Sequence, residues 1–333
     1  MKNFFEKVVP KSKIAGVISV VLVAGVLLIA LFQLAGSKWG KGWADNFFLY
    51  GLAIFCGIPF FVGILTPITL GYRHQISQGE SISYSLLALL GTGVMLLFFA
   101  VEGLICLVMA FPIVAVFTIV GSLLGHYLRK VSPHKETNIF SSFFLFLVLT
   151  PSVSFIENRI ETDKNLTPVT TSIEINAPPE RVWRNVVEFP ELAPPTELLF
   201  KTGVAYPMRA RINGAGIGAI RYCEFSTGAF VEPITIWDEN KLLQFSVDEQ
   251  PLPMRELTPY GDLDTPHLHD YFVSRKGQFK LTRLENGNTL LEGTTWYYHK
   301  ISPEFYWRIW TEQIVHAIHQ RVLNHIKEQS EKS

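Results

Sequence analysis

The stretch SIEINAPPERVWRNVVEFPE, residues 172–191, joins an alternating run, two prolines and an amphipathic segment. Ile173 and Ile175 alternate with polar residues, which is typical of a strand with one buried face. Pro178 and Pro179 cannot extend a strand ladder, but the first turn of a helix tolerates them. Apolar residues then recur at helical spacing, at Val182, Trp183, Val186 and Val187. The stretch therefore predicts a strand followed directly by a helix.

The rest of the C-terminal half reads as short strands divided by turn signals. We expect these strands at about 208–212, 219–225, 230–237, 242–247, 277–284 and 289–298. The last two flank Asn286-Gly287, which is a strong hairpin signal. A final helix at about 303–327 has a predicted inner stripe of Phe305, Ile309, Ile314, Ile318, Val322 and Ile326. This order predicts an α+β domain whose curved antiparallel sheet wraps the last helix.

Four segments of this half match one known family: INAPPERVWRNVVEFPE, GIGAIRYCEF, LEGTTWYYH and the terminal helix. Over about residues 168–330 the chain resembles the SRPBCC superfamily of START-like, helix-grip proteins, which includes polyketide cyclase/dehydrase and lipid-transport members. The resemblance implies an elongated apolar cavity between the sheet and the last helix. It leaves the activity open, because members bind lipids, sterols, hormones or polyketides and some catalyse reactions.

The N-terminal half, residues 1–157, is predicted to be an all-α integral membrane bundle. Its apolar runs reach the roughly 20 residues that cross a bilayer. We expect five spans, at about 14–35, 47–70, 83–101, 104–128 and 139–156. The break between the third and fourth lies near Glu102-Gly103 or near Phe111-Pro112, because one helix over the whole run would be about twice as long as the bilayer is thick. Residues 158–167 are expected to be a polar linker.

Charge placement predicts the orientation of these spans. With the N-terminus inside, five spans keep Arg73 and the pair Arg129-Lys130 on the inner side, as the positive-inside rule favours. The C-terminal domain then lies outside, in the periplasm if the membrane is a bacterial inner membrane. Lys38 and Lys41 in the first outer loop weaken this orientation. The 29 basic and 29 acidic residues form no strong basic block, so we expect no nucleic-acid partner.

The segment 250–271 is too long for a hairpin turn and is rich in polar residues. Loops of this length are often lids or binding loops, although a solvated loop is the alternative. Its candidate ligand contacts are Glu256, Tyr260, His267 and His269. The two histidines and nearby carboxylates are a weak metal signature, and we predict no metal site.

Strand parity supplies four more candidates, namely Glu224, Glu232, Glu292 and Trp296. A carboxylate that points into an apolar cavity has a raised pKa and can orient a ligand hydroxyl. The alternative is a carboxylate paired with Arg209, Arg211 or Arg221. His316 and His319 are spaced by three on the terminal helix, which favours a wetted helix face over a metal pair. The glycine run 214–218 lies between two strands, so we read it as a tight hairpin rather than a dinucleotide loop.

Together these features predict a membrane-anchored protein that binds or transfers a lipid or another hydrophobic small molecule. Its partners are expected to be that molecule and the bilayer; no cofactor is implied, and the sequence names no protein partner. Catalysis is less favoured, although a cyclase- or dehydratase-like enzyme that uses pocket carboxylates or histidines remains an alternative. A membrane sensor or assembly protein is the second alternative.

Overall fold

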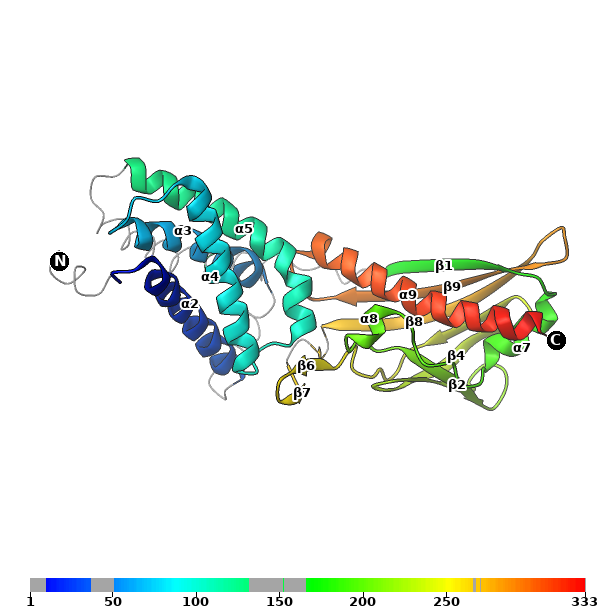
Figure 1. Ribbon diagram of the computed structural model, residues 1–333. Helices are drawn as coiled ribbons and strands as arrows, with labels where there is room; N and C mark the ends of the chain where they lie inside the picture. The colour runs from blue at the N-terminus through cyan, green and yellow to red at the C-terminus, as the bar shows by residue number, and fades with distance from the viewer. Residues whose placement is uncertain are drawn as a thin grey trace. The chain divides into compact units, whose positions relative to one another are not determined.

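The computed structural model shows a helical part and a part built on a β-sheet (Figure 1). It describes residues 10–36, 51–131, 152, 166–265, 268–269 and 271–332. By its internal contacts the chain divides into two units. The helical unit comprises Met1–Thr162, Glu256–Leu263 and Ile301–Tyr306, and the sheet unit comprises Asp163–Arg255, Asp264–Lys300 and Trp307–Ser333. Apart from Ser152, the predicted fifth span lies outside the described residues.

Among its described residues, the helical unit contains four helical segments that are long and apolar enough to cross a membrane. They are α2 (Lys13–Gly36), the π-helical turn η1 (Ala53–Gly57) continued by α3 (Ile58–Gly71), α4 (Gln78–Phe98) and α5 (Leu104–Val131). The break between α4 and α5 falls at residues 99–103, whereas Pro112 lies inside α5. Leu87, Leu90 and Val94 on α4 are at least half exposed, as expected for a helix surface that faces lipid.

Glycines bring α3 and α5 close together within this unit. A Cβ added to Gly121 on α5 would lie 2.1 Å from the carbonyl oxygen of Phe60. One added to Gly63 on α3 would lie 2.2 Å from the carbonyl oxygen of Thr118. Small residues at helix contacts are typical of membrane bundles, because dispersion contacts there replace the hydrophobic effect.

The sheet unit is built on one seven-stranded antiparallel sheet in the order β1-β9-β8-β5-β4-β3-β2. Its strands are β1 (Thr167–Ile175), β2 (Pro207–Asn213), β3 (Ile220–Phe225), β4 (Gly228–Asp238), β5 (Leu242–Ser246), β8 (Phe272–Arg283) and β9 (Thr289–His299). Its helices are α7 (Pro179–Val187), α8 (Leu198–Lys201) and most of α9 (Glu304–Glu331). This is the helix-grip arrangement that the sequence predicts.

Strand β1 begins earlier than its sequence suggests. The predicted linker ends at residue 167, and the polar run through Thr171 reads as part of a tether, but Thr167–Thr171 pairs with β9. Because β1 belongs to an antiparallel sheet, one of its faces can be exposed to water and stay polar. Threonine is also β-branched and favours extended backbone, so a Thr-rich run suits this position.

The quoted stretch folds as its pattern predicts. Strand β1 ends at Ile175, Pro179 is the first residue of α7, and the apolar face of that helix packs into the core. Val182 is completely buried, and the indole of Trp183 meets that of Trp237 on β4 edge to face at 5.4 Å. Aromatic pairs in this geometry stabilise beyond the area they bury.

The core of the sheet unit lies between the concave face of the sheet and α9. Leu323 and Ile326 on α9 are fully buried there against Leu243 and Leu291 of the sheet. The predicted inner stripe is wrong at its start, because Phe305 is 69% exposed and Ile309 is 58% exposed. Their helical spacing matches that of the buried residues, but their part of α9 lies outside this hydrophobic core.

Candidate functional site

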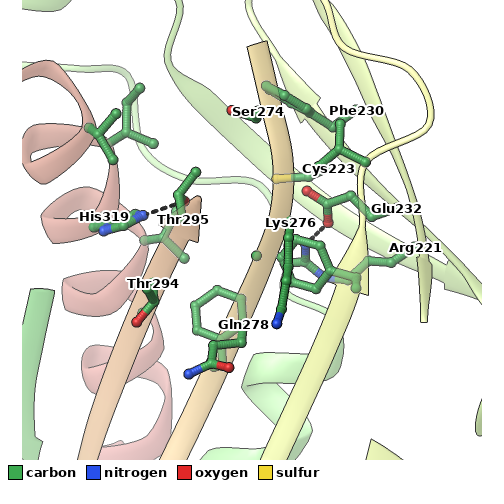
Figure 2. Close-up of a pocket in the computed structure, with 18 of the residues that line it drawn as sticks. Arg221, Cys223, Phe230, Glu232, Ser274, Lys276, Gln278, Thr294, Thr295 and His319 are labelled. Carbon is green, nitrogen blue, oxygen red and sulfur yellow. Dashed lines mark hydrogen bonds and ion pairs between the residues drawn. The ribbon is translucent and has the colours of Figure 1, made fainter. Parts of the chain in front are cut away.

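A cavity of about 110 Å³ lies between the sheet and α9 (Figure 2). Its walls are mainly apolar. From the sheet come Phe225, Phe230, Phe245, Phe272 and Phe279. From the helix come Val315, Ile318, Val322 and Leu323. An apolar hollow with a few polar groups is the usual form of a small-molecule site.

Two glycines lie in the sheet wall of the cavity. Gly277 on β8 pairs with Phe245 on β5, and a Cβ at Gly277 would lie 2.4 Å from the Phe245 ring. Gly293 on β9 lies against Leu323, where a Cβ would be in ordinary contact at 3.7 Å. The Phe245 ring therefore occupies space that a side chain at Gly277 would fill.

The wall formed by β3 and β4 carries a buried ion pair. Arg221 and Glu232 stand opposite each other in the β3–β4 register, and their side chains form a hydrogen-bonded salt bridge. Only 1% of Arg221 and 5% of Glu232 is exposed. The Arg221 guanidinium also lies over the rings of Phe245 and Phe279, with centroids 5.5 and 5.6 Å away. Cation–π contacts of this kind are strongest where water is excluded.

Burial determines how this wall can react. Loss of solvation raises the pKa of Glu232, although the Arg221 charge opposes that shift. Burial, with the Glu232 charge, also raises the pKa of the Cys223 thiol to about 12. A thiol with so high a pKa stays protonated at neutral pH, so Cys223 is not an activated nucleophile. This wall can pair with a polar ligand group but supplies no thiolate.

The wall formed by α9 carries His319, which Figure 2 shows opposite the ion pair. Its Nε2 lies 2.8 Å from Oγ1 of Thr295 on β9, and its Nδ1 lies 3.1 Å from Oγ1 of Thr171 on β1. Loss of solvation, with a smaller effect of His316, lowers the pKa of His319 to about 4. The imidazole is therefore neutral near pH 7 and can both donate and accept one hydrogen bond.

Among the predicted strand residues, Glu232 lines the cavity. Glu224 points to the other face of β3 and pairs with Arg209 and Arg211. Glu232 pairs with Arg221, so carboxylates pair with all three arginines named as alternative partners. Glu292 lies 3.4 Å from Lys280 on the face turned away from α9. The Trp296 ring lies 4.6 Å below the Lys276 ammonium. Each of these four residues has a charged partner, but of the four Glu232 alone is part of the cavity wall.

The predicted lid contains a two-stranded hairpin, β6 (Glu256–Thr258) and β7 (Gly261–Leu263), which groups with the helical unit. Glu256 is fully buried and accepts a hydrogen bond from the Cys106 thiol at 2.6 Å. Tyr260 is 64% exposed, and its ring contacts that of Phe98. The described residues of segment 250–271 contribute nothing to the cavity lining.

The two predicted histidines of that segment have separate outcomes. His269 lies 2.5 Å from Asp264 on the surface, whereas His267 lies outside the described residues. Within the described ranges, no group of three or more His, Cys, Asp or Glu side chains is placed to hold a metal ion.

Sequence reasoning missed Thr295 and His319 as cavity residues. The parity of β9 places Thr295 on the same face as Leu291 and Tyr297, which is the face that packs inward. The three-residue spacing of His316 and His319 placed them side by side on the helix, as the structure also has them. The predicted inner stripe contains Ile318 and Val322, which line the cavity beside His319, so what the sequence lacked was the position of the cavity along that stripe.

Comparison with known proteins found only likenesses to solved structures with low TM-scores. No family model matches the chain, and no curated protein matches it. A solved protein from Nitrosospira multiformis is 17% identical with a TM-score of 0.31, covering 49% of this chain and 95% of its own. Truncated norcoclaurine synthase from Thalictrum flavum is 15% identical with a TM-score of 0.31, covering 49% and 92%. The Aha1 dimer from Colwellia psychrerythraea is 14% identical with a TM-score of 0.30, covering 50% and 96%.

These likenesses are too weak to assign a function. The helix-grip description of the sheet unit instead rests on its own seven-stranded sheet and on the packing of α9 against it.

Proposed function

We propose that the sheet unit binds a small, mainly apolar molecule in the cavity beneath α9. The observation that carries this proposal is the cavity itself, with phenylalanines on the sheet wall and aliphatic side chains on the helix wall. Transfer of an apolar ligand into such a hollow is favourable because its surface leaves water. The few polar side chains in the walls fix the orientation of the ligand rather than the main part of its affinity.

The size of the cavity limits the ligand. Pockets for drug-sized ligands measure roughly 300–1,000 Å³, and an engineered cavity of roughly 150 Å³ holds benzene. At about 110 Å³ the space beneath α9 suits a single ring or the end of a chain. We therefore favour a small ring compound, or one end of a lipid, over a complete phospholipid.

The apolar helices give this binding module its setting. Four described helical segments are long and apolar enough to span a bilayer, and we propose that they anchor the chain there. A tethered site meets its ligand at a raised effective concentration when the ligand also partitions into the membrane. Membrane anchoring and an apolar binding site therefore fit one function, the capture of a membrane-soluble small molecule.

Filling the cavity is expected to weaken ligand binding strongly. In Val322→Phe the new ring occupies the space beneath α9, and we expect the affinity for fluorobenzene to fall by about tenfold or more. The measurement is a ¹⁹F NMR titration of the full chain in lipid nanodiscs, with the signal of empty nanodiscs subtracted. Gln313→Phe adds the same ring at an exposed position of α9 and should bind like the wild type. Equal fluorobenzene binding by Val322→Phe and the wild type contradicts the proposal.

The proposed topology places the sheet unit on the side of the membrane opposite to the N-terminus. In a variant without Cys56, Cys106 and Cys223, we expect Ile217→Cys to react with a membrane-impermeant maleimide on intact spheroplasts. Ile217 is 75% exposed in the β2–β3 turn, so access to its side chain is open. Gln75→Cys, in the α3–α4 loop, should react only after permeabilisation. Protection of both sites until permeabilisation contradicts five spans and favours an even number, whereas the reverse pattern contradicts the proposed orientation.

A further inference from the structure

Four side chains form a continuous hydrogen-bonded chain from the surface of α9 to the cavity. His316 Nδ1 lies 2.7 Å from Thr171 Oγ1, and the same oxygen lies 3.1 Å from His319 Nδ1. His319 Nε2 in turn lies 2.8 Å from Thr295 Oγ1. His316 is exposed, whereas His319 and Thr295 line the cavity (Figure 2). The chain therefore links a titratable surface group to the ligand space.

The donors and acceptors of this chain depend on one another. The Thr171 hydroxyl has one hydrogen, yet it contacts two imidazole nitrogens, so it can donate to only one of the rings. The other ring has to donate to the Thr171 oxygen. A third partner for this hydroxyl is not among the described contacts. If His319 accepts at Nδ1, its neutral ring donates from Nε2 to Thr295, and if it donates at Nδ1, it accepts from Thr295 at Nε2.

The chain consequently has two senses, and they present different groups to the cavity. In the inward sense His316 donates to Thr171, Thr171 donates to His319, and His319 donates to Thr295. The Thr295 hydrogen is then available to a ligand. In the outward sense every donor and acceptor is exchanged. Thr295 then donates its hydroxyl hydrogen to His319, His319 donates to Thr171, and Thr171 donates to His316. The Thr295 oxygen is then left to accept from a ligand.

Protonation of His316 selects between these senses. A protonated imidazole carries hydrogen on both nitrogens, so it can only donate to Thr171, and the inward sense is fixed. A neutral His316 can donate or accept at Nδ1, so the outward sense becomes accessible. A change between these two protonation states of His316 therefore changes the group that Thr295 presents to the cavity.

We propose that Thr295 recognises an oxygen substituent on the bound ring, and that the protonation of His316 sets which kind it prefers. A carbonyl is preferred when His316 is protonated, and a hydroxyl gains when His316 is neutral. This inference rests on the proposed function and names its ligand class: a small ring compound that carries a carbonyl or a hydroxyl group.

Other titratable groups lie near the chain, and the substitutions at Thr171 described below separate their effects from that of His316. On α9 itself these are Glu312 and His319, and His319 stays neutral above about pH 5.5 because its pKa is lowered to about 4. β1 has no charged residue from Thr167 to Ile173. On β9, His299 shares the inward face with Thr295. The cavity adds Arg221, Glu232 and Lys276, none of which is a partner of the Thr171 hydroxyl among the described hydrogen bonds.

The test compares three ¹⁹F probes on the full chain in nanodiscs at about pH 5.5 and about pH 8. 4-Fluorobenzaldehyde accepts a hydrogen bond, 4-fluorophenol donates one and keeps its proton at both pH values, and fluorobenzene does neither. We expect the ratio of the phenol and aldehyde dissociation constants to change by about 3- to 10-fold, with the phenol favoured at the higher pH. Fluorobenzene affinity should change little.

Substitutions at Thr171 separate this recognition from a merely structural role. Thr171→Val keeps the shape of the side chain but removes the hydroxyl that joins His316 to His319. It should remove the pH dependence of the ratio of the phenol and aldehyde dissociation constants, while fluorobenzene still binds. Thr171→Ser keeps the hydroxyl and should retain the dependence. His316→Ala should behave like Thr171→Val, and Gln320→Ala, at an exposed position on the same helix, should behave like the wild type.

The outcomes distinguish the two proposals. A ratio that does not change with pH in the wild type, while all three probes bind, overturns the inference and leaves the proposed function standing. A pH dependence that persists in Thr171→Val with unchanged fluorobenzene binding also overturns it. If none of the three probes binds, the proposed function fails and the inference fails with it.

Discussion

Replacing Glu232 by alanine is expected to lower the free energy of unfolding of the sheet unit by about 3–5 kcal/mol. The substitution removes the buried partner of Arg221 and leaves the guanidinium in a cavity wall from which water is largely excluded. The contacts of Arg221 with Phe245 and Phe279 offset only part of that cost. The measurement is urea-dependent pulse proteolysis of the full chain in nanodiscs, with cleavage in the sheet unit as the readout.

Two variants test the cause of that loss. Glu292→Ala removes a carboxylate from a partly exposed pair with Lys280, and should cost no more than about 1 kcal/mol. The double variant Arg221→Met with Glu232→Leu removes both charges, and should recover most of the loss because an apolar pair needs no partner. A Glu232→Ala protein as stable as Glu292→Ala would show that water or a rearranged side chain solvates Arg221.

Acid is expected to destabilise the sheet unit through His319. The native pKa of this imidazole is lowered from 6.5 to about 4, so between these values the unfolded chain binds a proton that the folded chain does not. Stability due to this group is therefore complete above about pH 6.5 and falls as the pH drops towards 4, by at most about 3 kcal/mol. The measurement is the same pulse proteolysis, repeated at several pH values from about 7 down to 4.

The matched variant is His319→Gln, which keeps a polar side chain without an imidazole that titrates. It loses some stability at pH 7, because at least one hydrogen bond weakens, but its stability should fall less between pH 7 and 4 than that of the wild type. His316→Gln, at the exposed end of the same chain, should follow the wild type more closely. Other groups whose pKa values shift on folding, such as Glu224 and Glu232, remain in both proteins, so their effects cancel in the comparison. Parallel pH curves for wild type and His319→Gln would contradict a neutral native imidazole.

The elements of the sheet unit follow from neighbouring residues. Ile173 and Ile175 determine a half-buried strand because alternate side chains share a face, and Val182, Trp183 and Val186 determine a helix because residues three and four apart share a face. The same parity placed Thr294 and Thr295 on opposite faces of β9. Parity alone does not say which face meets α9, so it does not favour Thr295 over Glu292 or Trp296 as a cavity residue.

The candidate site is decided by residues that are far apart in the chain. The pairing of Arg221 with Glu232, and of Glu224 with Arg209 and Arg211, depends on the register of β2, β3 and β4. The polar composition of the segment 250–271 suits a lid over the cavity as well as it suits a solvated loop. Its hairpin instead groups with the helical unit, a choice that composition does not encode.

By itself, the sequence determined the apolar helices, the order of strands and helices, and the α+β character of the C-terminal half. These features depend on the length of apolar runs and on contacts between residues two to four positions apart. Only the tertiary structure decided the cavity, the ion pair in its wall and the hydrogen-bonded chain to the surface. Thr171 and His316 are 145 positions apart, and their contact exists only because the edge strand β1 pairs with β9 and α9 packs across both. Local periodicity fixes which residues share a face, whereas sheet register and helix packing fix what that face meets.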